Sequence, residues 1–263
     1  MLWEAAIHQV RPHVVRIQTP NAQGTGFLAL YNYDSSWCGI ATAAHVVEYA
    51  DTWQLPIKID TENDSRFLNS NERVVFLDHQ TDSAVVLFLK GNLRLPETPI
   101  TLIPMDDTVS IGSEAGWLGY PNTYSDMMCF FAGTVSGRNV AQRFYLIDGV
   151  AIHGVSGGPV FRWSSQGEVQ IIGVMVAYHA NLATGAPLPG MSRAQDVSHF
   201  HGVINHIKSI DDANVRKKEF EEQSRGQAGT AIATMGGQPA ASPRPDDNPF
   251  TRDSAAVDIP AAD

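Results

Sequence analysis

The feature that most restricts the fold is a series of short apolar or alternating runs between Val14 and Arg193. Among these runs are GFLAL, GIATAA, RVVFL, SAVVLFL, SEAGWLGY and QIIGVMVAY, which Gly, Pro, Asn and Asp residues separate. Runs of this length between turn formers are typical of β-strands. No convincing ten-residue helical period interrupts them, so the pattern favours closed barrels or a sandwich over alternating strand–helix units. For a chain of 263 residues, two barrels packed together fit best.

The period changes near the end of the chain. Apolar residues recur there at i, i+3, i+4 and i+7, behind Ser198 as a helix N-cap; they are Phe200, Val203, Ile204 and Ile207. This predicts one amphipathic helix over about 198–210, extended by a charged stretch as far as Glu222. Beyond about Ser224 the sequence is rich in Ala, Gly and Pro and poor in large apolar residues, which predicts a disordered tail.

Charge and composition exclude several classes of function. The 18 basic and 28 acidic residues give a net charge of −10, which repels nucleic acid and anionic membrane surfaces. No stretch approaches the roughly 18 consecutive apolar residues of a membrane span. The start, MLWEAAIHQVRP, has Glu4 and His8 where a secretory signal would have positive charge and then an unbroken apolar run. We therefore expect a cytoplasmic protein. Cys38 and Cys129 are expected to be buried thiols, and the sequence alone does not decide whether they pair.

Three short segments carry residues of chemical interest. His45 ends an apolar run in TAAHVV, Asp82 enters one in TDSAVV, and Ser156 lies in the glycine-rich turn GVSGGP. Each of them alone is more often a structural residue or a turn residue. Their order along the chain, His then Asp then Ser, differs from that of the α/β-hydrolase elbow and matches the chymotrypsin arrangement.

The chemistry explains why these three residue types would be brought together. A serine hydroxyl is a poor nucleophile until an imidazole takes its proton, and a carboxylate fixes the tautomer of that imidazole. The glycines around Ser156 allow backbone amides to face a reacting carbonyl. We expect the N–H groups of Gly154 and Ser156 to form this oxyanion hole.

Further motifs make the sequence similar to the trypsin-like serine peptidases, and within them to the HtrA/Deg-like bacterial branch. The resemblance spans about 23–202, and its motifs are GTGF (24–27), LDHQTDSAVV (77–86), GYP (119–121), GTVSG (133–137) and DGVAIHGVSGGP (148–159). It implies an all-β fold of two packed six-stranded antiparallel barrels with a catalytic domain over 1–210. The first barrel would span about 10–105 and the second about 108–195, with the charged helix extension and tail over 211–263. The resemblance assigns the catalytic carboxylate to Asp82 rather than Asp78.

Two departures from the family pattern stand out. Digestive relatives have Asp immediately before the nucleophile and HtrA/Deg relatives usually have Asn, whereas this chain has Val155. Whether valine keeps the oxyanion loop ready is left open by the sequence. The residues beyond Ser209 are too few and too polar for the PDZ domain that usually follows, so we expect none.

The resemblance also implies which residues form the pocket for the side chain before the scissile bond. These are Val150, Ala151, His153, Met175 and Ala177, from the segments 150–153 and 173–178. Neither segment contains Asp, Glu, Lys or Arg, so a small-to-medium apolar side chain is expected rather than a basic one. The alternative is a polar contact from His153 or His179 to an acidic or amide side chain.

We therefore expect a cytoplasmic serine endopeptidase that uses His45, Asp82 and Ser156, forms an acyl-enzyme and needs no metal or other cofactor. His199, His201 and His206 lack the spacing of a zinc site and are expected on a solvated helix surface. The substrate would be a protein or peptide. The alternative is a latent or partner-regulated binding module that retains the fold but has little activity of its own, with a regulatory protein as its partner.

Overall fold

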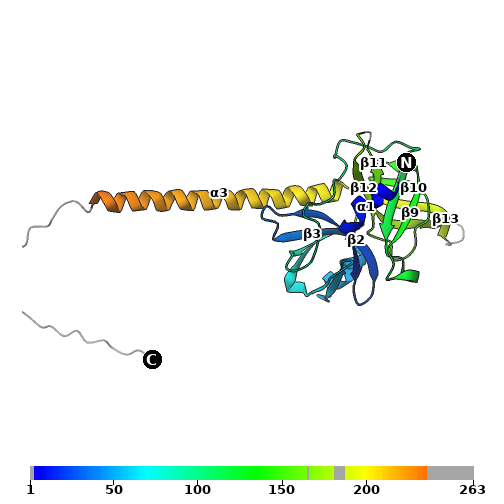
Figure 1. The fold of residues 1–263 in the computed structure, drawn as a ribbon, viewed down its shortest axis with the longest axis horizontal. Helices are drawn as coiled ribbons and strands as arrows, with labels where there is room; N and C mark the ends of the chain where they lie inside the picture. Colours follow the sequence, from blue (N-terminus) through cyan, green and yellow to red (C-terminus); the bar gives the residue numbers. More distant parts are fainter. Residues whose placement is uncertain (1–2, 165, 181–186, 236–263) are drawn as a thin grey trace, which may run out of the picture. The chain divides into compact units, whose positions relative to one another are not determined.

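The computed structural model describes residues 3–164, 166–180 and 187–235, with the side chains of 177–180, 187–189 and 225–235 left undescribed. The chain divides into two units, residues 1–214 and 215–263. The first unit holds two antiparallel sheets (Figure 1). The predicted all-β fold is confirmed, because short strands alternate with turns from Val14 to Asp196.

The first sheet has seven strands in the order β5-β4-β1-β2-β3-β7-β6. They are β1 (Val14–Gln18), β2 (Gln23–Tyr31), β3 (Trp37–Ala43), β4 (Ile57–Asp60), β5 (Ser65–Leu68), β6 (Arg73–Asp78) and β7 (Ser83–Leu89). The prediction of a closed six-stranded barrel is wrong for this half, because the described strands β5 and β6 at its two ends do not pair with each other. The short helix η2 (Ser70–Glu72) joins them instead.

The second sheet is the predicted closed six-stranded barrel, in the order β10-β13-β12-β11-β8-β9. Its strands are β8 (Glu114–Gly119), β9 (Cys129–Asn139), β10 (Phe144–Asp148), β11 (Pro159–Trp163), β12 (Val169–Ala180) and β13 (Pro187–Asp196). Closure is made by β10, which pairs with both β9 and β13.

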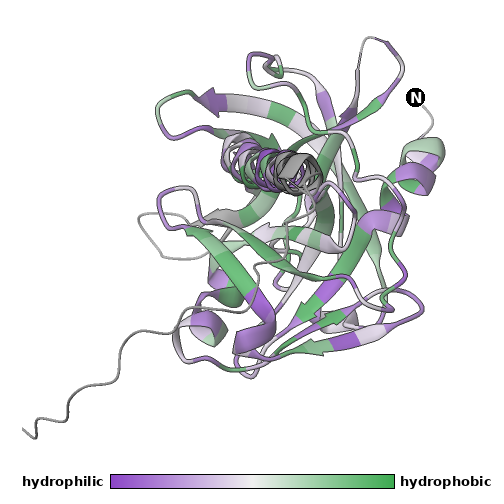
Figure 2. Ribbon diagram, turned by 90° about the vertical axis from the view of Figure 1, so that its left-hand side faces the viewer, coloured by the Kyte–Doolittle hydropathy of each residue, from purple (hydrophilic) through white to green (hydrophobic). Residues whose placement is uncertain are grey.

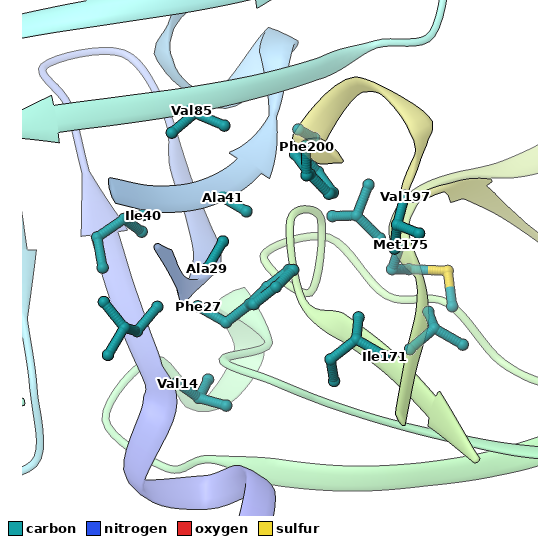
Figure 3. Packing of buried hydrophobic residues seen from close by; sticks show 14 of the residues in the cluster. Val14, Phe27, Ala29, Ile40, Ala41, Val85, Ile171, Met175, Val197 and Phe200 are labelled. Carbon is teal, nitrogen blue, oxygen red and sulfur yellow. The ribbon is translucent and has the colours of Figure 1, made fainter. Parts of the chain in front are cut away.

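One continuous hydrophobic core joins the two sheets. Figure 2 shows that the apolar residues are concentrated on the strands, while many of the turns are hydrophilic. In Figure 3, Phe27 of β2 lies between the first sheet and the β12 residues Ile171 and Met175. The Phe27 ring also meets the edge of the Phe200 ring, with 5.9 Å between their centroids. This shared core holds the two sheets against each other.

The helices differ in part from the prediction. The structure contains two short helices that the apolar pattern did not predict, α1 (Trp3–Val10) and α2 (Ala44–Thr52). The terminal helix α3 (Ser198–Met235) begins at the predicted residue but continues into residues predicted to be disordered. Residues 225–235 include several Ala residues, which have the highest helix propensity. The rest of the predicted tail, 236–263, lies outside the described residues, and the division into domains stays a prediction.

His199, His201 and Cys129 depart from expectation, whereas His206 is exposed and Cys38 is a buried thiol, as predicted. His201 Nε2 lies 2.8 Å from the Ile103 carbonyl oxygen, so part of the helix face that was predicted to be solvated packs against the segment at Ile103. Both cysteines are free, and Cys129 is only partly buried. Burial raises the pKa of the Cys38 thiol to about 12. None of the helices in the described part of the chain has the length and hydropathy needed to span a membrane.

Arg73 spans the unpaired end of the first sheet. Its side chain is only 1% exposed, and its guanidinium donates hydrogen bonds to the carbonyls of Leu68, Ala50 and Leu55 at 2.8, 3.0 and 2.7 Å. These bonds tie the first residue of β6 to the last residue of β5 and to the end of α2. A side chain thus links the strands that the backbone does not pair.

We expect Arg73→Met to destabilise the protein by about 1–3 kcal/mol, because a buried carbonyl left without a donor costs about that much, although the Ala50 carbonyl keeps the Leu55 N–H as a donor at 2.8 Å. Urea unfolding of the full chain measures this as a lower midpoint. Arg94→Met is the matched control, because the Arg94 side chain is 72% exposed and its surface ion pair with Asp64 contributes about 0–1 kcal/mol. Equal midpoints for the two variants would refute the bridging role of Arg73.

Candidate active site

His45 lies where the first sheet gives way to a helix. Strand β3 ends at Ala43 and α2 begins at Ala44, so His45 is in the first turn of a helix rather than at the end of a strand as predicted. The boundary escaped prediction because TAAHVV has no helical period and its N-cap residue is Ala43, whose side chain cannot cap a helix. The His45 side chain is about half exposed, at 47%.

Asp82 is brought to His45 by the register of two paired strands. Ala43 of β3 lies opposite Ser83 of β7, so the residue just before β7 falls beside the residues just after β3. Asp82 has a φ of 50°, in the left-handed region that Asp and Asn tolerate better than most residues. This turn directs its carboxylate back toward the start of α2.

The Asp82 carboxylate binds His45 through both of its oxygens. The His45 backbone N–H donates to one oxygen at 2.9 Å, and ring atom Nδ1 lies 2.7 Å from the other. The Asp82 carbonyl accepts a further bond from the Ala44 N–H at 3.0 Å. Asp82 therefore caps the first turn of α2 and, by the same contacts, fixes the orientation of the imidazole ring.

Ser156 lies in a turn that both sheets hold. Its carbonyl accepts a bond from the Thr25 N–H of β2 at 2.7 Å, and the Gly157 N–H donates to the Met175 carbonyl of β12 at 2.7 Å. Gly157 has a φ of 87°, and a Cβ there would overlap the Thr25 carbonyl oxygen. Only glycine fits this position, which explains one glycine of the GVSGGP motif.

The two amides predicted to form the oxyanion hole are held through the carbonyls of their own peptide groups. The His153 carbonyl accepts a bond from the Asn122 N–H at 2.8 Å, and the Val155 carbonyl accepts one from the Gly158 N–H at 2.9 Å. In a trans peptide the N–H points opposite to its C=O. The N–H groups of Gly154 and Ser156 therefore point away from these partners, and no acceptor among the described residues takes either of them.

Val155 packs inward beneath this turn. It is fully buried, and its Cγ1 occupies space that a Cβ on Gly119 would enter, at 2.8 Å. Val155 thus uses the GYP turn of residues 119–121 as a packing surface instead of forming the polar contact expected of Asp or Asn. With valine at this position, the His153 and Val155 carbonyls are both hydrogen-bonded, and the role of the two amides as an oxyanion hole stays a prediction.

A cavity of about 230 Å³ lies beside these groups. The residues that line it are His45, Ala151, Ile152, His153, Ser156, Met175 and Val176. None of these lining residues is Asp, Glu, Lys or Arg. His45 and Ser156 thus share one cavity, although the described contacts include no hydrogen bond between their side chains.

Comparisons with known proteins place this chain in a family. The model of the trypsin-like peptidase domain matches residues 24–174, more than half of the chain. The chain belongs to the trypsin-like peptidase family. Comparison with curated protein sequences gives no match.

Solved structures show that this trypsin-like peptidase shares its fold with bacterial proteins. A serine endoprotease from Yersinia pestis has 20% identity and a TM-score of 0.56 over 79% of this chain and 66% of that one. An inactive serine-to-alanine mutant of Rv3671c from M. tuberculosis has 19% identity and a TM-score of 0.53 over 76% and 89%. The inactive form of the Rv3671c protease has 19% identity and a TM-score of 0.52 over 76% of this chain and 91% of that one. This chain therefore spans slightly less than two thirds of the Yersinia pestis chain.

Three of the residues that were predicted for the substrate pocket of this trypsin-like peptidase line the cavity, and their role in binding stays a prediction. Ala151, His153 and Met175 line the cavity, whereas Val150 is 54% exposed and does not. The side chains of Ala177 and His179 lie outside the described residues. Sequence reasoning missed Ile152 and Val176, although each is the immediate neighbour of a residue that it named.

No group of three or more His, Cys, Asp or Glu residues suited to a metal occurs in the described part of this peptidase. Of the three α3 histidines, His199 packs near the Phe76 carbonyl oxygen at 3.4 Å and near Asp78 at 3.9 Å. Burial lowers the pKa of His199 from its usual value. His199 and His201 therefore serve the packing of α3, whereas His206 is exposed.

Proposed function

We propose that this chain is a serine endopeptidase that acts on proteins or peptides through a Ser–His–Asp triad. The observation that carries the proposal is the common cavity of Ser156 and His45, with the Asp82 carboxylate 2.7 Å from the far ring nitrogen of His45. Family membership supports the same reaction class.

The proposed reaction begins when Ser156 Oγ attacks the peptide carbonyl and His45 Nε2 takes the hydroxyl proton. Asp82 accepts from His45 Nδ1–H, which keeps Nε2 free as the base and stabilises the imidazolium. The N–H groups of Gly154 and Ser156 bind the developing oxyanion. His45 then protonates the leaving amine, which departs. In deacylation, water attacks the acyl carbon while His45 takes its proton, and His45 returns that proton to Ser156 Oγ as the acid product leaves.

A fluorophosphonate probe tests this function directly. We expect purified protein to be labelled on Ser156, with the adduct identified by peptide mass spectrometry, because only an activated serine reacts readily. The lack of a described Ser156–His45 hydrogen bond favours one second candidate, a latent peptidase that a partner completes. Labelling only in the presence of cell extract would support that candidate, and no labelling under either condition would support a binding module.

The proposed specificity follows from the lining of the cavity. Ala151, Ile152 and Met175 give it an apolar character and no lining side chain pairs with a basic residue, so we infer a small-to-medium apolar residue before the scissile bond. His153 is the polar group that could favour an acidic or amide side chain instead.

Cleavage profiling with a peptide library tests the pocket. We expect apolar preference in the wild type and a gain of Lys or Arg cleavage in Ile152→Asp, because this change places a carboxylate in the cavity. Val150→Asp is the matched control, since Val150 is an exposed neighbour outside the cavity. Preference of the wild type for Lys or Arg would contradict the inferred pocket, and preference for Glu or Gln would favour the role of His153.

A further inference from the structure

A buried hydroxyl of the first sheet reaches into the nucleophile turn of the second. Thr25, in β2, is fully buried. Its Oγ donates to the Gly154 carbonyl at 2.8 Å and accepts from the Tyr120 N–H at 3.0 Å. A hydroxyl has one proton to donate, so Gly154 takes the only donor that Thr25 Oγ has.

Gly154 is the residue that most needs such a contact. Its φ of 95° lies in the region that glycine enters freely, so its own backbone imposes little restraint on the two peptide groups that flank it. The first of these groups carries the oxyanion N–H and is held by the Asn122 N–H at the His153 carbonyl. The second is held at the Gly154 carbonyl by Thr25 Oγ.

Thr25 also acts on the first of these two contacts through the segment 120–122. By accepting from the Tyr120 N–H, its hydroxyl holds the segment that supplies the Asn122 N–H. This segment packs tightly on the turn, because a Cβ on Gly154 would overlap the Tyr120 carbonyl oxygen and Asn122 Oδ1. One hydroxyl therefore restrains both peptide groups around Gly154.

We propose that Thr25 is a positioning residue for the oxyanion hole, whose hydroxyl keeps the Gly154 N–H directed at the substrate oxyanion. This role rests on the proposed function. Thr25 touches neither substrate nor the reacting atoms, and it acts through Gly154 and the segment 120–122. Its effect belongs to the transition state, in which the oxyanion carries its charge, rather than to ground-state binding of the peptide.

Thr25→Ala and Thr25→Ser together isolate the hydroxyl, since both remove the methyl group and only Ala removes the oxygen. The assay measures kcat and KM for a peptide substrate. It also measures inhibition by a peptide aldehyde, whose hemiacetal with Ser156 places an oxyanion in the hole, and by the matching peptide amide, which forms none. Tyr31→Phe is the control on the same strand, because it removes a hydroxyl bond of 2.7 Å to the Pro96 carbonyl away from the cavity.

We expect Thr25→Ala to lower kcat about 10- to 100-fold, less than the ~10²–10³-fold lost when an oxyanion donor is removed outright. Aldehyde affinity should fall by a similar factor, while KM and amide affinity stay nearly unchanged. Thr25→Ser and Tyr31→Phe should retain wild-type kcat. Thr25→Val, which lacks the hydroxyl but fills the volume, carries the same expectation as Thr25→Ala if the alanine variant does not fold.

An active wild type combined with unchanged kcat and aldehyde affinity in the hydroxyl-free variants would overturn the role of Thr25. So would equal losses of aldehyde and amide affinity, because they would show a general disturbance of the cavity. A wild type that neither cleaves peptides nor reacts with the fluorophosphonate probe is a distinct result, which overturns the proposed function and this inference with it.

Discussion

Ser156→Ala is expected to lower kcat on peptide substrates by about 10⁶-fold, as loss of the nucleophile does in other serine proteases. The reason is that no other described hydroxyl lies in the cavity beside His45. Turnover of a peptide substrate by purified protein measures the effect, and covalent labelling by fluorophosphonate should disappear with it. The substitution should leave the fold intact, because the described hydrogen bonds of Ser156 are made by its backbone.

Ser136→Ala, at an exposed position in β9, is the matched control and should retain full activity. Both variants are to be purified in parallel so that a contaminating peptidase would appear equally in each. A Ser156→Ala protein that hydrolyses peptides as fast as the control would refute the assignment of the nucleophile.

Asp82→Asn is expected to lower kcat by about 10⁴-fold, the loss seen when the equivalent change leaves the imidazole in the wrong tautomer. Asparagine tolerates the left-handed φ of 50° at this position, so the turn before β7 should persist. Its amide, however, donates to His45 Nδ1, which places the ring proton on Nε2 and removes the base. The pH-independent kcat of the purified variant measures the loss.

Asp78→Asn separates this effect from a general loss of acidic charge. Asp78 lies four residues earlier and accepts the Gln80 N–H at 2.9 Å, away from the residues that line the cavity. It should keep wild-type kcat. If Asp78→Asn lost activity and Asp82→Asn kept it, the assignment of the carboxylate would be wrong.

The sequence predicted the all-β class and the family because both can be recognised from short, local sequence patterns. Alternating apolar runs between turn residues indicate strands, and the GTGF, TDSAVV and GVSGGP segments are motifs that indicate the trypsin-like family. Helix α2 was missed because it is short and its cap comes from Asp82, far along the chain, rather than from its own N-cap residue Ala43. The open first sheet was missed because closure depends on whether β5 pairs with β6, which the sequence does not show. Nor does the sequence distinguish Arg73, which links these strands, from a surface arginine.

The candidate site was predicted at the level of named residues, and their catalytic roles stay predictions. His45 and Asp82 meet because of the β3–β7 register, which the sequence does not contain. Val150 was assigned to the pocket by likeness alone, and the structure shows it exposed and outside the lining of the cavity. Thr25 was visible only as part of the GTGF motif, since its partner carbonyl at Gly154 lies 129 positions further along the chain. Location in the cytosol and any regulatory partner also remain predictions.

The division of labour between the two sheets has a consequence for how the enzyme would fail. His45 and Asp82 belong to the first sheet and Ser156 to the second, so under the proposed mechanism neither half is competent by itself. Hydrolysis then depends on the seam between the halves more than on the integrity of either. A small displacement of one sheet relative to the other would therefore abolish hydrolysis even if every strand stayed folded.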